Sequence, residues 1–362
     1  MKRTLVIAAA ISLVASGAIA QEEAIVNVYN WSDYIAEDTI EKFTAETGIK
    51  VNYDVFDSNE IVEAKLLTGN SGYDIVVPSA SFLERQIKAG LFQKLDKSKL
   101  TNIGNMDETI MAAVTTADPG NEHSVVYMWG STGFGYNTDA IAERMPDAPV
   151  GSWDMIFNVD VVSKFADCGV SLLDAPAEVI PAALQYLGRD PNSQEAADLE
   201  AAEELITSVR PYIRYFHSSQ YISDLANGDT CLAHGYSGDV LQARDRADEA
   251  EAGVSIDYVI PSEGAVIWFD MLAIPSDAPH ADNAHKFINF VMQPQIAADI
   301  SNYVWYANAN AASFDLIDEE VTTDPAIYPS DEVKAKLFAT RAYSAKFDRL
   351  LTRAWTRIKT GQ

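Results

Sequence analysis

The chain is poor in basic side chains. It carries 26 Lys and Arg against 53 Asp and Glu, which gives a formal net charge of −27 at pH 7. A surface of this charge repels the phosphates of nucleic acids and anionic lipid head groups. We therefore expect no nucleic-acid partner. The same charge would attract cations, but an acidic surface also keeps a protein soluble, so charge alone assigns no function.

Long apolar runs are missing beyond the first twenty residues, and no later stretch reaches the roughly 18 apolar residues of a membrane span. At the start, Lys2 and Arg3 precede a short apolar run over residues 5–14, and residues 18–20 form a small-residue cleavage site. This pattern predicts a signal peptide over residues 1–20, cut after Ala20, rather than an uncleaved membrane anchor. No Cys follows the cut, so we expect a soluble periplasmic protein without a lipid anchor.

Cysteine is nearly absent, with only Cys168 and Cys231 in the chain. An even number of cysteines in an exported protein favours a disulfide over two buried thiols. Closing a loop of this length would stabilise the fold by roughly 4 kcal/mol on the chain-entropy estimate. Because the C-x-x-C spacing is absent, the pair does not suggest a metal site or a redox enzyme.

Sequence motifs of common enzymes are also missing. There is no P-loop, residues 235–238 (Gly-Tyr-Ser-Gly) lack the spacing of a nucleophile elbow, and residues 133–135 (Gly-Phe-Gly) lack the third glycine of a dinucleotide site. Among the five histidines, His280 and His285 are five residues apart, which does not align them on one helix face as metal ligands. We therefore expect no metal, no cofactor and no enzymatic activity. An exported enzyme stays open as an alternative, because catalytic groups can assemble from distant residues.

The N-terminal third alternates strands and helices. Strands are predicted at 24–29, 51–56 and 73–77, and helices at 37–46, at 60–67 and from a capping box at Ser81 and Glu84 to Gly90. This order predicts a parallel sheet with helices on both faces. In such sheets ligands bind beyond the carboxyl ends of the strands.

The rest of the chain continues as an α/β protein. Strands are predicted at 123–135, 170–173, 231–235, 254–259 and 266–273, and helices at 139–145, 177–187, 193–209, 281–292, 332–338 and 347–358, with a short helix opening at 217–220. The pattern predicts two lobes, each a central sheet flanked by helices, joined by a hinge that the chain crosses more than once. We assign residues 21–128 plus 248–312 to lobe 1 and residues 129–247 plus 313–362 to lobe 2. Such a hinge suits a ligand held between the lobes.

Aromatic residues recur beside acids or small polar residues at predicted strand ends. The four places are residues 30–34 (Asn-Trp-Ser-Asp-Tyr), 235–239 (Gly-Tyr-Ser-Gly-Asp), 268–270 (Trp-Phe-Asp) and 305–308 (Trp-Tyr-Ala-Asn, without an acid). Aromatic faces attract cations, and carboxylates accept the charge-assisted hydrogen bonds that an ammonium group donates. A single such site is more often core packing or an Asx turn. Only the repetition favours a site for a small organic cation with an apolar body.

The sequence resembles the periplasmic polyamine-binding proteins of bacterial ABC transporters, the putrescine- and spermidine-binding family. The segments that carry the resemblance are 30–35, 73–86, 171–179, 214–229, 235–240, 269–275, 306–310 and 352–359. The resemblance implies a two-lobed periplasmic binding protein fold that closes on its ligand. It also implies delivery of the polyamine to permease subunits of an ABC transporter in the inner membrane. We expect a monomer.

The resemblance also implies roles for particular residues. Trp31 and Tyr34 would wall the ligand, with polar contacts from Ser32, Asp33 and Ser79. From the second lobe, Glu178 would meet one amine, and Ser218, Tyr236 and Asp239 would line that side. Asp270 would hold an ammonium group, with Trp268 and Tyr306 stacking on the methylene chain. The two cysteines of the family support a bridge between Cys168 and Cys231.

Departures from the family pattern do not single out one polyamine as the ligand. Tyr236 stands where the family has Trp, which weakens one wall of the site. Trp268 favours spermidine, whereas Ala175 and Ser81 are typical of putrescine-binding members. Putrescine and spermidine are therefore both expected, and agmatine or cadaverine remain alternatives. An amino acid would need a cationic clamp for its carboxylate, and a sugar would not need several acids.

Overall fold

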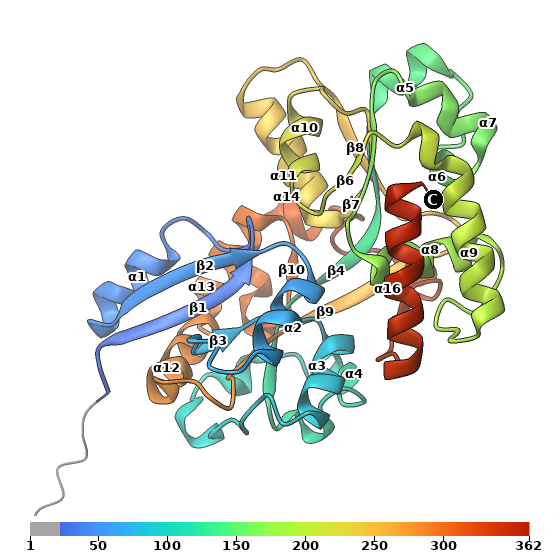
Figure 1. Ribbon diagram of the computed structural model, residues 1–362. Helices are drawn as coiled ribbons and strands as arrows, with labels where there is room; N and C mark the ends of the chain where they lie inside the picture. Colours follow the sequence, from blue (N-terminus) through green and yellow to red (C-terminus); the bar gives the residue numbers. More distant parts are fainter. Residues whose placement is uncertain (1–21, 362) are drawn as a thin grey trace, which may run out of the picture.

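The computed structural model describes residues 22–361, and it shows a mixed α/β protein (Figure 1). The signal peptide predicted over residues 1–20 lies outside the described residues. No helix among residues 22–361 combines the length and the apolar character that crossing a membrane would need. The predicted α/β class is confirmed.

Strands join into one connected sheet with the order β2-β1-β3-β9-β4-β7-β5-β6. Three further short strands extend it, because β8 and β10 pair with β4, and β11 pairs with β9. The strands are β1 Ile25–Trp31, β2 Lys50–Phe56, β3 Ile75–Val76, β4 Ser124–Asn137, β5 Val170–Leu172, β6 Tyr215–Phe216, β7 Leu232–Tyr236, β8 Ile256–Val259, β9 Val266–Ala273, β10 Ala307–Asn308 and β11 Phe338–Ala339. The groups β1–β3 and β5–β7 are each internally parallel, as the alternation of strands and helices predicts.

The long strand β4 connects the two parallel groups. Its first part, residues 124–132, pairs antiparallel with β9, which in turn pairs with β3. Its last part pairs with β7 over residues 132–136 and with β8 over residues 134–137. Of its fourteen residues, only the last is not buried, so β4 runs through the core over nearly its whole length.

Helices cover both groups of strands (Figure 1). On one side α12 packs on β1, and on the other side α16 packs against α8 and α9. The helices are α1 Thr39–Thr47, α2 Asn59–Leu67, α3 Ala80–Lys88, α4 Glu108–Ala113, α5 Thr138–Arg144, α6 Asp154–Phe157, α7 Val159–Val162, α8 Pro176–Tyr186, α9 Ala196–Val209, α10 Gln220–Ala226, α11 Ser237–Glu249, α12 Ala281–Val291, α13 Pro294–Val304, α14 Glu319–Thr322, α15 Asp331–Lys334 and α16 Ala345–Thr360.

Several local predictions are wrong in detail. The capping box at Ser81 and Glu84 is not formed, because Ser79 is the N-cap and α3 already begins at Ala80. The helix predicted over residues 332–338 shrinks to α15, and the chain then becomes extended in β11. The strand at 73–77 is only two residues long as β3. Helices α11 and α13 were both missed: a turn was expected after residue 235 where α11 begins, and α13 follows α12 after only two residues.

Candidate ligand-binding site

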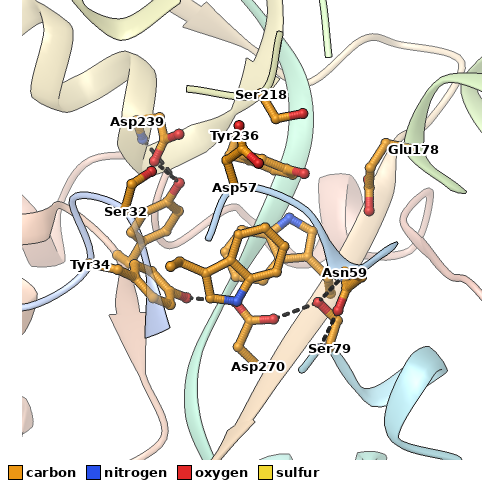
Figure 2. Close-up of a pocket in the computed structure, with 13 residues that line it drawn as sticks. Ser32, Tyr34, Asp57, Asn59, Ser79, Glu178, Ser218, Tyr236, Asp239 and Asp270 are labelled. Atoms are coloured by element: carbon orange, nitrogen blue, oxygen red, sulfur yellow. Dashed lines mark hydrogen bonds between the residues drawn. The ribbon is translucent and has the colours of Figure 1, made fainter. Parts of the chain in front are cut away.

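A pocket lies where the carboxyl ends of strands from both parallel groups meet, which is the place the strand order predicts. It is lined by residues that end or follow β1, β2, β3, β5, β6 and β7, together with two residues of β9 and one that precedes β10 (Figure 2). The lining residues are Trp31, Ser32, Tyr34, Asp57, Asn59, Ser79, Glu178, Ser218, Tyr236, Asp239, Trp268, Asp270 and Tyr306.

Asp270 on β9 accepts hydrogen bonds from two hydroxyl groups, one on a residue that follows β1 and one on a residue that follows β3. Its Oδ1 accepts a hydrogen bond from the Ser79 hydroxyl at 2.6 Å, and its Oδ2 accepts one from the Tyr34 hydroxyl at 3.0 Å. Asn59 fixes Ser79 in turn, since its amide group bonds both the hydroxyl and the backbone N–H of Ser79. Burial nevertheless raises the pKa of Asp270 to about 7, against the lowering effect of these two hydrogen bonds.

Asp239 lies in the first turn of α11 and is held in the same manner. The hydroxyl groups of Tyr221 and Tyr306 donate to its two carboxyl oxygens, each at 2.7 Å. Gly238 permits this approach of Tyr306, because a Cβ at that position would lie 2.5 Å from the tyrosine ring. Burial raises the pKa of Asp239 to about 7, although both hydrogen bonds lower it. The carboxyl group is therefore close to the balance between its neutral and charged forms at neutral pH.

Glu178 lies in the first turn of α8 and has a single donor. Its Oε2 accepts a hydrogen bond from the Thr132 hydroxyl at 2.7 Å. Burial raises its pKa to about 8, and the charges of Glu60 and Asp270 add to the rise. A carboxyl group with one protein donor and so little access to water has unused acceptor capacity, which a bound cation can fill.

Aromatic rings form a continuous wall beside these acids. The ring centroids of Trp31 and Tyr236 lie 6.0 Å apart, those of Tyr236 and Trp268 5.9 Å, and those of Trp268 and Tyr306 5.3 Å. Tyr34 continues the row at 5.1 Å from Tyr306. All four contacts are edge-to-face, the arrangement that aromatic pairs prefer. The wall presents apolar surface to an alkyl chain and negative ring faces to a cation.

The pocket has carboxyl groups but no basic partner for them. Asp57, Glu178, Asp239 and Asp270 line it, and no Lys, Arg or His among residues 22–361 does so. Buried charge without a partner is unfavourable, which is why burial raises three of these pKa values. The arrangement can bind a small cation with more than one charged nitrogen. Nowhere between residues 22 and 361 do three His, Cys, Asp or Glu side chains cluster so that they could hold a metal ion.

The structure brings together eleven of the twelve residues singled out from the sequence. The exception is Asp33, which has a left-handed backbone (φ 54°) and does not line the pocket. Its carboxyl group instead forms an ion pair with Arg246 of α11 at 2.6 Å. This ion pair holds the Asp33 carboxyl group outside the pocket that Ser32 and Tyr34 line.

Two lining residues, Asp57 and Asn59, were missed in the sequence. Both follow the carboxyl end of β2 directly, so the strand-end rule that singled out Ser79 also applies to them. Phe56 directly precedes Asp57, so β2 also ends in an aromatic residue beside an acid, but this pair was not among the four places singled out from the sequence.

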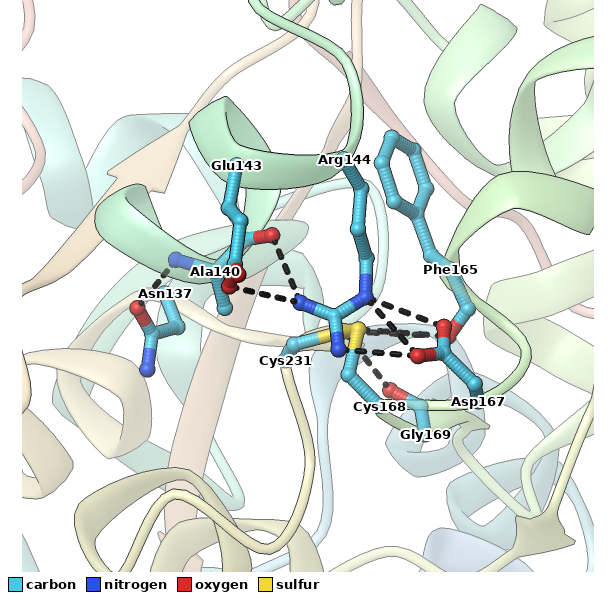
Figure 3. Close-up of polar contacts among 9 residues, drawn as sticks. All are labelled: Asn137, Ala140, Glu143, Arg144, Phe165, Asp167, Cys168, Gly169 and Cys231. Carbon is cyan, nitrogen blue, oxygen red and sulfur yellow. Dashed lines mark hydrogen bonds and ion pairs between the residues drawn. A yellow bond between two sulfur atoms is a disulfide. The ribbon is translucent and has the colours of Figure 1, made fainter.

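The predicted cysteine bridge is confirmed and lies away from the pocket. Cys168 and Cys231 are joined, with a Cα–Cα distance of 5.5 Å and a sequence separation of 63 residues. The bridge ties the chain just before β5 to the chain just before β7, and these two strands pair in parallel. Beside it, Arg144 of α5 forms an ion pair with Asp167 at 2.9 Å (Figure 3).

Comparison with known proteins identifies the class. The sequence profile of a family described as bacterial extracellular solute-binding protein matches residues 38–329, and the chain belongs to this family. Among solved structures, a putative spermidine/putrescine ABC transporter protein from Listeria monocytogenes matches with a TM-score of 0.84 and 31% identity, covering 94% of this chain and 100% of that one. The two-lobed periplasmic binding protein fold is thereby confirmed.

Curated relatives narrow the comparison. A putrescine-binding periplasmic protein from Pseudomonas aeruginosa (strain UCBPP-PA14) is 55% identical over 350 residues, covering 96% of this chain and 95% of the relative. A putrescine-binding periplasmic protein from Escherichia coli (strain K12) is 51% identical over 358 residues, covering 98% and 97%. The predicted relationship to periplasmic polyamine-binding proteins is confirmed, and these relatives are binding proteins rather than enzymes.

The hydrogen bond from Tyr221 gives a test of how the site holds its charge. Tyr221 does not line the pocket, and we expect Tyr221→Phe to raise the pKa of Asp239 above about 7 by removing one donor. We also expect a loss of about 1–3 kcal/mol of stability, because the Tyr221 hydroxyl also accepts a hydrogen bond from the backbone N–H of Tyr236 and two buried hydrogen bonds are lost. The ionisation of Asp239 can be followed by carbon NMR of its carboxyl group in each variant.

The matched control for Tyr221→Phe is Tyr215→Phe. The Tyr215 hydroxyl donates to Asp224 at 2.6 Å, and neither residue lines the pocket. This control should leave the titration of Asp239 unchanged. An identical Asp239 titration in Tyr221→Phe and in the unaltered protein would contradict the role given to Tyr221.

The disulfide gives a second test, on stability. Replacing both Cys168 and Cys231 by Ser should lower the free energy of unfolding by about 2–4 kcal/mol, because the unfolded chain regains the freedom of a loop of 63 residues. Urea denaturation followed by tryptophan fluorescence measures this change, and the double variant itself with added reductant is the control. A double variant as stable as the unreduced parent would show that the bridge adds nothing.

Proposed function

We propose that this protein is a periplasmic receptor that captures a linear polyamine, putrescine or spermidine, and delivers it to an ABC importer. The observation that carries the proposal is a pocket with four carboxyl groups and five aromatic side chains, into which no basic side chain of residues 22–361 projects. The names of the relatives, which bind putrescine, support the same ligand class.

The chemistry of a diamine matches this arrangement. Each ammonium group needs acceptors to replace water, and Asp239 and Asp270 offer carboxyl oxygens in two separate places. The methylene chain between the nitrogens gains by leaving water, and the row of rings from Trp31 to Tyr306 provides the apolar contact. Glu178 supplies a further acceptor for one nitrogen. A neutral solute would leave these acids buried without compensation.

Residues from both parallel groups contribute to the proposed site. Trp31 and Ser79 belong to the group that contains β1 and β3, whereas Glu178 and Asp239 belong to the group that contains β5 and β7. A ligand that contacts both groups favours the closed arrangement of two lobes. We propose lobe boundaries at 21–128 and 129–247, as the sequence suggests. Since β8 pairs with residues 134–137 of β4, we move the later boundary from residue 248 to the segment after β8.

The proposed location and partner are supported by the family. We propose export by the signal peptide of residues 1–20 to the periplasm, which agrees with a family of extracellular proteins. The closed receptor, as a monomer, would dock on the permease subunits of an ABC transporter in the inner membrane, as the names of solved relatives suggest.

Other small cations are the second candidate. A putrescine/agmatine-binding protein from Pseudomonas aeruginosa (strain ATCC 15692) is 41% identical over 337 residues, and a putrescine/cadaverine-binding protein from the same strain is 33% identical over 359 residues. Agmatine and cadaverine carry the same two charges as putrescine, so the acids alone do not separate them. Calorimetry with putrescine, spermidine, spermine, cadaverine and agmatine ranks the ligands.

Removing one carboxylate at a time tests the proposed anchors. We expect Asp239→Asn and Asp270→Asn each to weaken putrescine binding about 30-fold or more, because each leaves an ammonium group without its charged partner. Isothermal titration calorimetry measures the dissociation constants. Asp38→Asn is a suitable control, since Asp38 is exposed, forms an ion pair with Lys42 on the helix surface and lies outside the pocket. If either pocket variant bound as tightly as the control, that residue would lose its assigned role.

The raised pKa values make binding depend on pH. Near pH 7 the empty site holds protons on a fraction of Glu178, Asp239 and Asp270, whose pKa values are about 8, 7 and 7. A bound dication favours the charged carboxylates, so binding should release protons at pH 7 and hardly any at pH 9. Affinity should fall as the pH falls from 8 to 6. Calorimetry in two buffers of different ionisation enthalpy counts the protons, and buffer-independent heats at pH 7 would argue against buried acids as anchors.

A further inference from the structure

A second hollow adjoins the pocket, and Asp57 and Ser218 line both of them. Helix α2, the start of α8 and the end of α16 surround it, with apolar wall residues Ile61, Pro176 and Trp355. Asp57 and Ser218 thus stand at the junction of the two hollows, and Figure 2 shows Ser218 at the upper edge of the pocket.

The hollow carries more negative than positive charge. Asp57, Glu60 and Asp174 line it, whereas Lys359 is its only Lys or Arg among residues 22–361. Lys359 is paired with Asp174, because its ammonium group donates hydrogen bonds to both carboxyl oxygens of Asp174 at 2.9 and 2.8 Å. The indole N–H of Trp355 also donates to Asp174 at 2.7 Å. Asp174 is thus compensated by direct contacts, whereas Asp57 and Glu60 form no ion pair with a Lys or Arg of residues 22–361.

Neither remaining acid has a good partner within residues 22–361. Glu60 forms no ion pair and no side-chain hydrogen bond to another residue there. The basic side chain nearest to Asp57 is His217, whose Nδ1 lies 4.0 Å away. That nitrogen accepts hydrogen bonds from the backbone N–H groups of Ser219 and Gln220, so it has no proton to donate to Asp57.

Ser218, at the junction of the two hollows, has a buried hydroxyl group that is free to bind a polar ligand. Its side chain is only 4% exposed, and its hydroxyl has no hydrogen-bond partner within the described chain. Buried hydroxyl groups are normally bonded, and each exception calls for an explanation. Since Ser218 lines both hollows, a ligand that passes from one to the other would contact it.

The electrostatics connect the hollow with the end of the pocket. Burial raises the pKa of Glu178 to about 8, and the charge of Glu60 adds to this rise. Burial likewise raises the pKa of Glu60 to about 7, with Glu63 and Asp174 adding to the rise and Arg85 opposing it. A cation between Glu178 and Glu60 would relieve the repulsion that each experiences.

We propose that this hollow is an outer subsite for the third nitrogen of a triamine, with Glu60 and Asp57 supplying the charge and Ser218 a hydrogen-bond acceptor. The inference rests on the proposed function, because it places the other two nitrogens in the main pocket. Spermidine has the required chemistry, since an aminopropyl group extends one end of its putrescine unit. Glu60 then discriminates polyamines by length without touching a diamine.

The test is the variant Glu60→Gln, which removes the charge and keeps the shape. Calorimetry should show that spermidine binds about three- to tenfold more weakly, because one charge-assisted contact is lost, while putrescine changes by less than about twofold. The matched control is Glu41→Gln, the same change on the exposed face of α1 and outside both hollows. In this control neither ligand should change by more than about twofold.

A second ligand makes the result independent of the variant's stability. Acetylation of the aminopropyl nitrogen of spermidine removes the third charge and leaves the putrescine unit intact. The unaltered protein should prefer spermidine to this derivative about three- to tenfold, and Glu60→Gln should lose that preference.

Failure of the subsite and failure of the proposed function have different signatures. Equal weakening of both ligands by Glu60→Gln, no weakening of either, or a protein that binds putrescine but not spermidine would overturn the subsite and leave the polyamine receptor standing. A protein that binds no polyamine at all would overturn both.

Discussion

The chemistry of this protein depends on the cost of burying carboxyl groups without a basic partner. Glu178, Asp239 and Asp270 are each less than 10% exposed, and hydroxyl groups of Thr, Ser and Tyr are the side-chain donors to their oxygens. Hydroxyl groups compensate part of the lost hydration, but they bring no charge. A cation supplies what is missing, and the protein thereby selects for charge before it selects for shape. In the proposed subsite, Glu60 and Asp57 extend the same principle beyond the pocket.

The fold determines where a cation can bind and compensate the buried carboxyl groups. Parallel strands present their carboxyl ends at one edge of the sheet, and here two parallel groups present theirs to the same pocket. Neither group holds a complete set of acids and rings. Asp270 comes from β9 on one side, and Asp239 comes from α11 on the other. A ligand that bound both acids would contact both groups at once, and on the proposed function this contact couples capture of the ligand to closure of the lobes.

Much of this arrangement could be predicted from the sequence, and the failures have physical causes. Aromatic residues beside acids or small polar residues predicted most of the pocket, because the pattern recurs at several strand ends. Asp33 shares the motif but lies outside the pocket, because its carboxyl group pairs with Arg246, 213 residues further on. Asp57 follows Phe56 and carries the same pattern, whereas Asn59 is neither an acid nor next to an aromatic residue and gave no such signal. The short α15 and the true start of α3 depend on tertiary contacts that local patterns do not contain.

A crystal structure of the protein grown with putrescine tests the central claim most directly. The account predicts one ammonium nitrogen within about 3.2 Å of a carboxyl oxygen of Asp239 or Glu178 and the other within the same distance of Asp270, with the methylene chain against the rings of Trp31, Trp268 and Tyr306. Density for putrescine elsewhere on the molecule, or in the pocket with its nitrogens turned away from these acids, would contradict it.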